Sequence, residues 1–276
     1  MITTGWPYSS SKKTDVVDVV SGESCANLAK FPVKNDGAVG TNLDGTPVVC
    51  GGMGWPKRYK TCYKFTNAGW QEFANMKEKR YLGAGIMYKN KFHVFGGFDG
   101  SNWGQTSEII SIDGGVEYGP EIPVATRHEI TSINATVSVL SGGTTLTNSH
   151  PTWLFNHETQ AFSFGPSLLE GRYAHGSATV VDKVTTAKIP IVTGGSGNNG
   201  IMDSTEMLIN GIWQSGTIQL KETNKKNILI GSKGQEISRA IFLKTPLPKK
   251  GRNFFMDFCP SLLNGSKKTI AYYYVY

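Results

Sequence analysis

The chain has 276 residues, of which 39% are apolar and 18% are charged, so it can bury a sizeable core and is globular rather than disordered. It contains no uninterrupted apolar stretch of about 18 residues, and its first ten residues lack the basic start and apolar middle of a secretory leader. The net charge of +7 comes from residues 214–276, which hold 11 Lys and Arg against 3 Asp and Glu, in clusters typical of solvated loops. We therefore expect neither membrane insertion nor nucleic-acid binding.

An apolar run that ends on two glycines recurs along the chain. It reads PVVCGG ending at Gly52, HVFGG at Gly97, SVLSGG at Gly143 and PIVTGG at Gly195, at spacings of 45, 46 and 52 residues, and a degenerate copy, ITTGW, opens the chain. Glycine is disfavoured inside a strand, so each pair indicates a sharp turn or a close approach of two backbones at the end of a strand. Self-similarity at such a period indicates a repeat architecture.

Two further features keep the same period. Each glycine pair is followed by a hairpin signal with an aromatic residue, in the segments CYKFTNAGW, IISIDGGVEY, WLFNHETQAF and EMLINGIW. A basic residue and an alternating strand then lead to the next pair, with Arg80, Arg127 and Arg172 spaced 47 and 45 residues apart. Four short strands in about 46 residues are typical of one propeller blade.

This pattern resembles the kelch repeat. The diglycine, the hairpin aromatic and the Arg-x-x-His strand of that repeat are matched best by GRYAHGSATVVDK and the IPIVTGG that follows it. The resemblance covers residues 1–213 and implies an all-β, kelch-type β-propeller that occupies residues 1–276 as a single domain. At this repeat length the chain allows six blades. No diglycine follows Trp213, so residues 214–276 form either degenerate fifth and sixth blades, which we favour, or a segment that has replaced them.

The four cysteines, Cys25, Cys50, Cys62 and Cys259, lack the Cys-x-x-Cys spacing of a structural zinc site. Cys50 ends one predicted strand and Cys62 lies in the strand expected beside it. Among the disulfides that Cys25, Cys50 and Cys62 could form, Cys50–Cys62 is therefore slightly preferred. Free buried thiols in a cytosolic protein are equally compatible with the sequence.

Two Asn-x-Ser/Thr sequons, at Asn134 and Asn264, are compatible with export and glycosylation. Asn134 falls at the predicted turn between the first two strands of a blade, where a glycan would be exposed. We expect an extracellular protein whose leader is not part of this sequence, with the cytoplasm as the alternative.

The sequence offers no recognisable catalytic constellation. Its five histidines show neither the His-x-x-x-His nor the His-Glu-x-x-His spacing of a metal site; we expect His175 to be structural and His93 to lie on a strand surface. Nucleophile elbows, P-loops, dinucleotide fingerprints and sialidase-type Asp boxes are absent from the sequence. Galactose oxidase is built on kelch-like blades, but its copper ligands match no motif here. We expect no cofactor, no metal and no catalysis.

The loop after each glycine pair and the loop before each Arg-containing strand should share one face, because successive turns of a meander alternate between the two ends of a blade. We predict that this face binds a protein partner, and the alternative ligand is a glycan. In the alternative structural roles, the arginines bridge neighbouring blades and the tryptophans cap blade ends. The predicted binding residues are Trp55, Arg58, Tyr59, Arg80, Asn102, Trp103, Arg127, His150 and Arg172.

The resemblance implies a non-catalytic binding module, and fold alone does not determine function. The alternatives are a secreted carbohydrate-binding or galactose-oxidase-related protein, and a ubiquitin-ligase adaptor of the kind that pairs kelch blades with an oligomerisation domain.

Overall fold

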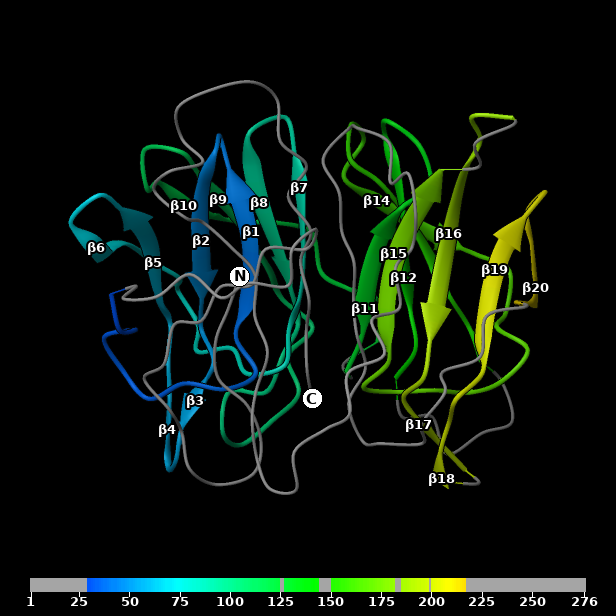
Figure 1. Ribbon diagram of the computed structural model, residues 1–276, viewed down its shortest axis with the longest axis horizontal. Coiled ribbons are helices and arrows are strands. Elements are labelled where there is room, and N and C mark those ends of the chain that lie inside the picture. The colour runs from blue at the N-terminus through cyan, green and yellow to red at the C-terminus, as the bar shows by residue number, and fades with distance from the viewer. Residues whose placement is uncertain (1–28, 125–126, 144–149, 182–184, 199, 217–276) are drawn as a thin grey trace, which may run out of the picture.

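A computed structural model of the chain describes residues 29–124, 127–143, 150–181, 185–198 and 200–216. These residues form four antiparallel sheets of four strands each, and they contain no helix. Each sheet is a meander in chain order, and the sheets stand side by side (Figure 1). The all-β propeller predicted from the sequence is confirmed, and each sheet is one blade. No helix of the described ranges could span a bilayer.

The strands have the following bounds. Blade 1 contains β1 (Val39–Leu43), β2 (Thr46–Cys50), β5 (Thr61–Thr66) and β6 (Gly69–Asn75), and blade 2 contains β7 (Ala84–Tyr88), β8 (Lys91–Phe95), β9 (Ser107–Ser111) and β10 (Val116–Tyr118). Blade 3 contains β11 (Glu129–Ser132), β12 (Val137–Ser141), β13 (Trp153–Asn156) and β14 (Ala161–Phe164), and blade 4 contains β15 (Gly176–Val181), β16 (Lys188–Thr193), β19 (Thr205–Ile209) and β20 (Ile212–Ser215). Two small hairpins pair β3 (Met53–Gly54) with β4 (Lys57–Arg58) and β17 (Ser196–Gly197) with β18 (Gly200–Ile201).

The blades are packed in chain order. The first strand of each blade contacts the first strand of the next, in the order β1, β7, β11 and β15. The four blades account for the four glycine pairs. The opening ITTGW, Cys25, Cys259, Asn264 and residues 217–276 lie outside the described residues, and so do the fifth and sixth blades that the sequence allows.

Each glycine pair directly follows the second strand of its blade. In blade 1 the pair is Gly51 and Gly52, both with positive φ, of 69° and 93°. A Cβ atom on Gly51 would lie 2.3 Å from the carbonyl oxygen of Arg80, and one on Gly52 would lie 1.9 Å from the side-chain oxygen of Asn35. Both the backbone conformation and the available space therefore require glycine.

The interior consists of clusters between neighbouring blades, because a central strand has one blade on each side. In β8, Phe92 and Val94 pack into the cluster shared with blade 1, whereas Phe95 packs into the cluster shared with blade 3. Side chains of a strand alternate between its two faces, so a strand buried on both sides needs consecutive apolar residues. The apolar runs before the glycine pairs are such strands.

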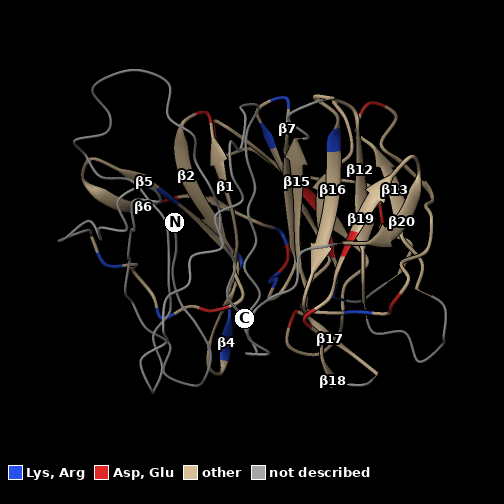
Figure 2. Ribbon diagram, turned by 45° about the vertical axis from the view of Figure 1, so that its right-hand side comes forward, with Lys and Arg blue, Asp and Glu red and all other residues tan. Residues whose placement is uncertain are grey.

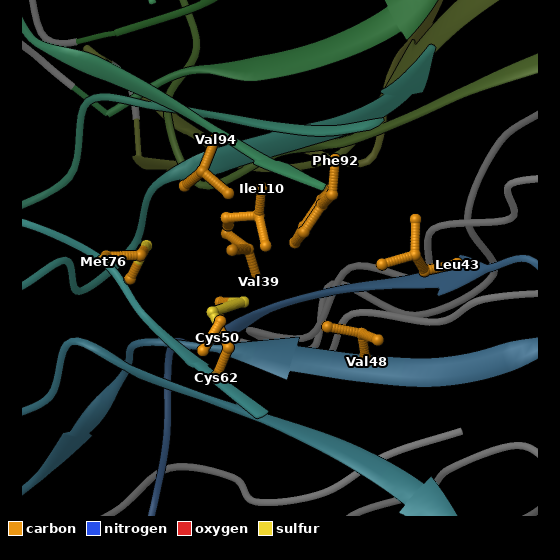
Figure 3. Close-up of a cluster of buried hydrophobic side chains, with 10 residues drawn as sticks. Val39, Leu43, Val48, Cys50, Cys62, Met76, Phe92, Val94 and Ile110 are labelled. Carbon is orange, nitrogen blue, oxygen red and sulfur yellow. A yellow bond between two sulfur atoms is a disulfide. The ribbon is translucent and has the colours of Figure 1, made fainter. Parts of the chain in front are cut away.

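Cys50 and Cys62 are directly opposite each other in β2 and β5 and are joined by a disulfide. This is the pairing that the sequence slightly favoured. The disulfide lies within the cluster between blades 1 and 2, beside Val39, Met76 and Ile110 (Figure 3).

Candidate functional site

The loops after the glycine pairs and the segments that enter the next blade meet at one end of the propeller. The hairpins β3–β4 and β17–β18 both project from this end, the lower one in Figure 1. The Gly52 amide donates to the Arg80 carbonyl at 2.7 Å, and Tyr81 and Phe98 exchange two backbone hydrogen bonds of 3.1 and 2.7 Å. We call this end, formed by the post-diglycine loops and the segments entering the following blades, the diglycine face.

An aromatic and arginine cluster lies on the diglycine face where blade 1 meets blade 2. The Arg58 guanidinium carbon is 5.5 Å from the centre of the Trp55 ring and 5.6 Å from the centre of the Phe98 ring. Phe98 in turn packs against Trp103, with ring centres 5.5 Å apart. We call Trp55, Arg58, Phe98 and Trp103 the Trp55 patch. Trp55 is 69% exposed, so the patch presents a large aromatic surface to solvent beside a fixed positive charge.

The β3–β4 hairpin positions Trp55 and Arg58. Met53 pairs with Arg58 and Gly54 with Lys57, so Trp55 lies in the two-residue turn between the strands. Arg58 Nη1 donates to the carbonyl of Pro56 at 2.7 Å. Tyr59 is half-buried and packs over Gly54, where a Cβ atom would lie 2.5 Å from its hydroxyl. Lys57 and Arg58 form the basic strand β4 at the lower end of the view in Figure 2.

Asp99 holds the opposing loop. Its Oδ1 atom accepts hydrogen bonds from the amides of Ser101, at 2.6 Å, and Asn102, at 2.8 Å. These hydrogen bonds lower the pKa of Asp99, and the bond from Asn102 has the larger effect. The loop brings Trp103 back to Phe98 through an isolated backbone bridge, and it leaves the Asn102 side chain exposed at the edge of the patch.

A carboxyl and a phenol lie beside the Trp55 patch. Burial raises the pKa of Asp36 to about 6, although the hydrogen bond with Tyr81 and the charge of Arg58 both lower it. Burial and the charge of Asp36 raise the pKa of Tyr81 to about 12, against the charges of Arg127 and Arg58. Asp36 thus places a carboxyl group on the same face as the basic β3–β4 hairpin.

Arg80 and Arg172 were predicted to bind a partner, and the structure corrects this. Only 2% of Arg80 and 1% of Arg172 is exposed, so neither guanidinium is available to a ligand. Arg80 donates to the carbonyls of Gly96, at 2.7 Å, and Thr106, at 2.9 Å. The backbone of Arg80 bonds to blade 1 and its side chain to blade 2, so the alternative prediction, that the arginines bridge neighbouring blades, describes this residue.

A buried glutamate completes each of these two sites. Arg80 Nε donates to Glu108 at 3.1 Å, and Arg172 Nη2 donates to Glu206 at 2.8 Å. Glu206 also accepts the amides of Leu169, at 2.7 Å, and Glu170, at 3.2 Å. We call the pairs Arg80–Glu108 and Arg172–Glu206 the arginine latches. Sequence reasoning missed the glutamates, although each stands eleven residues after the second glycine of its pair.

Arg127 differs in position from Arg80 and Arg172, and its charge acts on Tyr81 beside the Trp55 patch. Arg80 and Arg172 lie four residues before the first strand of their blade, whereas Arg127 lies two residues before Glu129, the first residue of β11. Equal sequence spacing therefore conceals a different structural position. His150 lies against Gly171, where a Cβ atom would be 2.6 Å from its ring, and its carbonyl accepts the Leu168 amide.

His93 is buried, in contrast to the surface position expected for it. It faces blade 3, with its ring centre 5.5 Å from that of His157. Ser138 Oγ lies 2.7 Å from His157 Nε2. Burial lowers the pKa of both histidines to about 4, with the charge of His157 as a further cause for His93. His175 is buried, and its Nε2 lies 3.0 Å from Ser141 Oγ of blade 3.

Among the described residues, no group of three or more His, Cys, Asp or Glu side chains could hold a metal ion.

Comparison with known proteins gives a similar solved structure and a local sequence similarity to kelch-repeat proteins. The solved structure of YjhT has the same fold, with a TM-score of 0.60 over 74% of this chain and 76% of YjhT, at 13% sequence identity. No family model matches the chain. A stretch of 69 residues, 24% of the chain, is 42% identical to the kelch repeat-containing protein kel-10 of Caenorhabditis elegans. It is equally similar to a kelch repeat and BTB domain-containing protein of the same organism.

The match covers 12% of the length of each of these two relatives. Together with the four diglycine blades, these similarities show that the fold is a kelch-type β-propeller.

Proposed function

We propose that the protein is a non-catalytic binding module that captures a protein partner on the diglycine face, with the Trp55 patch at the centre of the interface. The exposure of Trp55 carries this proposal. Trp55 is 69% exposed and lies against Arg58, which also contacts Phe98 of blade 2, and an exposed aromatic patch of this kind indicates an interaction surface.

The geometry supports this role in two ways. Tryptophan and arginine dominate the binding energy of protein interfaces, because they combine a large contact area with directional donors. The patch is also held in advance of binding, since Arg58 lies against rings from both blades and hydrogen-bonds to Pro56. A fixed patch loses little side-chain entropy on association.

The test is partner capture by the intact chain, immobilised and exposed to an extract of the tissue or medium that contains it, with retained proteins identified by mass spectrometry. Trp55→Ala and Arg58→Ala should each weaken the retained interaction about 30-fold, the effect of losing an interface hot spot. Phe164→Ala is the matched control, because Phe164 is 77% exposed but lies on the outer strand of blade 3.

Trp55→Ala should leave urea unfolding unchanged, because Trp55 is 69% exposed, and the urea unfolding of Arg58→Ala and Phe164→Ala separates loss of partner contact from loss of stability. Equal capture by Trp55→Ala, Arg58→Ala and the wild-type chain would contradict the proposal. If soluble glycans displace the captured protein, or bind alone with the same dependence on Trp55, the ligand is a carbohydrate and the protein-partner proposal is wrong.

A further inference from the structure

The turn between β11 and β12 carries a sequon in a well-defined conformation. Asn134 and Ala135 are exposed, and Thr136 is the third residue of the sequon. The Asn134 Oδ1 atom accepts hydrogen bonds from the amides of Thr136, at 2.9 Å, and Val137, at 2.8 Å, and from the Thr136 hydroxyl at 3.4 Å. The carboxamide oxygen thus faces the protein backbone.

The amide nitrogen of Asn134 is correspondingly available. Once Oδ1 is held by the turn, Nδ2 is the free end of the carboxamide, and no described residue accepts a hydrogen bond from it. Asparagine is glycosylated at this nitrogen when it precedes x-Ser or x-Thr on an exposed loop of an exported protein. From this geometry we infer that Asn134 carries an N-linked glycan.

The reaction is a group transfer that balances without a redox step. The donor is a lipid-linked oligosaccharide pyrophosphate, supplied with its transferase by the secretory pathway. The bond between the anomeric carbon and the pyrophosphate oxygen breaks, and a bond forms between that carbon and Asn134 Nδ2. Nδ2 loses one proton to the transferase, and the lipid pyrophosphate leaves.

A second feature of the chain fits the same compartment. Disulfides persist where the surroundings are oxidising, as they are along the export route on which N-glycans are added. The Cys50–Cys62 disulfide lies in blade 1, and Asn134 lies in blade 3, so the two observations are independent.

The position of the turn leaves the proposed interface uncovered. Strand β12 begins three residues after Asn134 and ends at Ser141, directly before Gly142 and the diglycine face. Asn134 is therefore at the opposite end of blade 3. A glycan on it would cover the far end of the propeller and leave the Trp55 patch open.

The experiment examines the chain from its natural source. Trypsin releases residues 128–172 as one peptide, because no Lys or Arg lies between Arg127 and Arg172. Enzymatic deglycosylation in heavy-oxygen water should label Asn134 in this peptide. The same peptide recovered wholly unmodified from the natural chain would overturn the inference.

Variants assign the modification to this residue. The full chain with Asn264→Gln, directed into the secretory pathway of cultured cells, should show a glycosidase-sensitive mass that Asn134→Gln and Thr136→Ala each remove and Thr136→Ser retains. Thr136→Ala keeps the Asn134 side chain and its backbone turn, so the result does not depend on the fold tolerating Asn134→Gln.

Asn156→Gln is the matched control. Asn156 makes the same kind of turn, accepting the Glu158 amide at 2.9 Å, but Glu158 stands where a sequon needs Ser or Thr. The glycan mass should persist in this variant. Glycosylation that persists in Asn134→Gln, with Asn264 also replaced by Gln, would show that the glycan is elsewhere and refute the inference.

Discussion

Replacing Glu206 by Ala should destabilise the propeller by removing the only buried carboxylate of the Arg172–Glu206 latch. The Arg172 side chain is fully buried, and Glu206 is 3% exposed. Removing one partner of a buried ion pair costs about 3–5 kcal/mol, because the other charge stays away from water. The substitution also leaves the amides of Leu169 and Glu170 without their hydrogen-bond acceptor. Glu170, half-exposed and 3.4 Å from Arg172, offsets part of the effect. We therefore expect a loss of about 3 kcal/mol.

The assay is equilibrium unfolding in urea, followed by tryptophan fluorescence and circular dichroism, with the slope checked for constancy. Glu117→Ala is the matched control, since the Lys91–Glu117 pair is nearly as short, 2.9 Å against 2.8 Å, but its side chains are 49% and 61% exposed. An exposed pair contributes at most about 1 kcal/mol. The double variant Arg172→Met with Glu206→Leu should recover part of the loss, because it removes both charges together but leaves the Leu169 and Glu170 amides without their acceptor.

A loss in Glu206→Ala no greater than that in Glu117→Ala would refute the reasoning. It would mean that the Arg172 guanidinium reaches water or finds another acceptor when Glu206 is absent. A double variant as unstable as the single one would refute the assignment of the loss to an unpaired charge.

The remaining predictions concern the blade interfaces. Burial lowers the pKa of His93 and His157 to about 4, below the ordinary 6.5, so both are neutral in the folded protein. The free energy of unfolding should therefore be highest above pH 6.5 and should decrease as the pH falls towards 4, by up to about 3 kcal/mol for each histidine. A urea midpoint unchanged between pH 7 and pH 4.5 would contradict this. Reduction of the Cys50–Cys62 disulfide, which closes a loop with a sequence separation of 12, should lower stability by about 3 kcal/mol. The comparison is urea unfolding with and without reductant, and a Cys50→Ala, Cys62→Ala chain should not respond to reductant.

The period of the chain predicted the fold because blades depend on local signals. A second strand buried on both sides needs consecutive apolar residues, and the crowded turn after it needs glycine, so both leave a mark in the sequence. The sharing of one face by the loops followed from the alternation of turns in a meander. His93 shows the limit of the alternation argument. The face opposite Phe92 would meet solvent in a single sheet, but here it meets blade 3.

The site was less predictable because its contacts join separate blades. The Trp55 patch needs Phe98, a residue of the next blade that no motif distinguished. The burial of Arg80 depends on Glu108, 28 residues later in the chain, so exposure could not be judged from the arginine alone. Arg127 fitted the average spacing, but the distance from an arginine to its strand depends on the connecting segment, which varies from blade to blade.

The arginine latches also bear on synthesis of the chain by the ribosome. Glu108 lies 28 residues after Arg80, and Glu206 lies 34 after Arg172. The first half of each latch thus leaves the ribosome well before its counter-charge. The arginine before the first strand of the blade therefore has no glutamate to pair with until the third strand of that blade has been translated. This favours folding of whole blades over folding strand by strand.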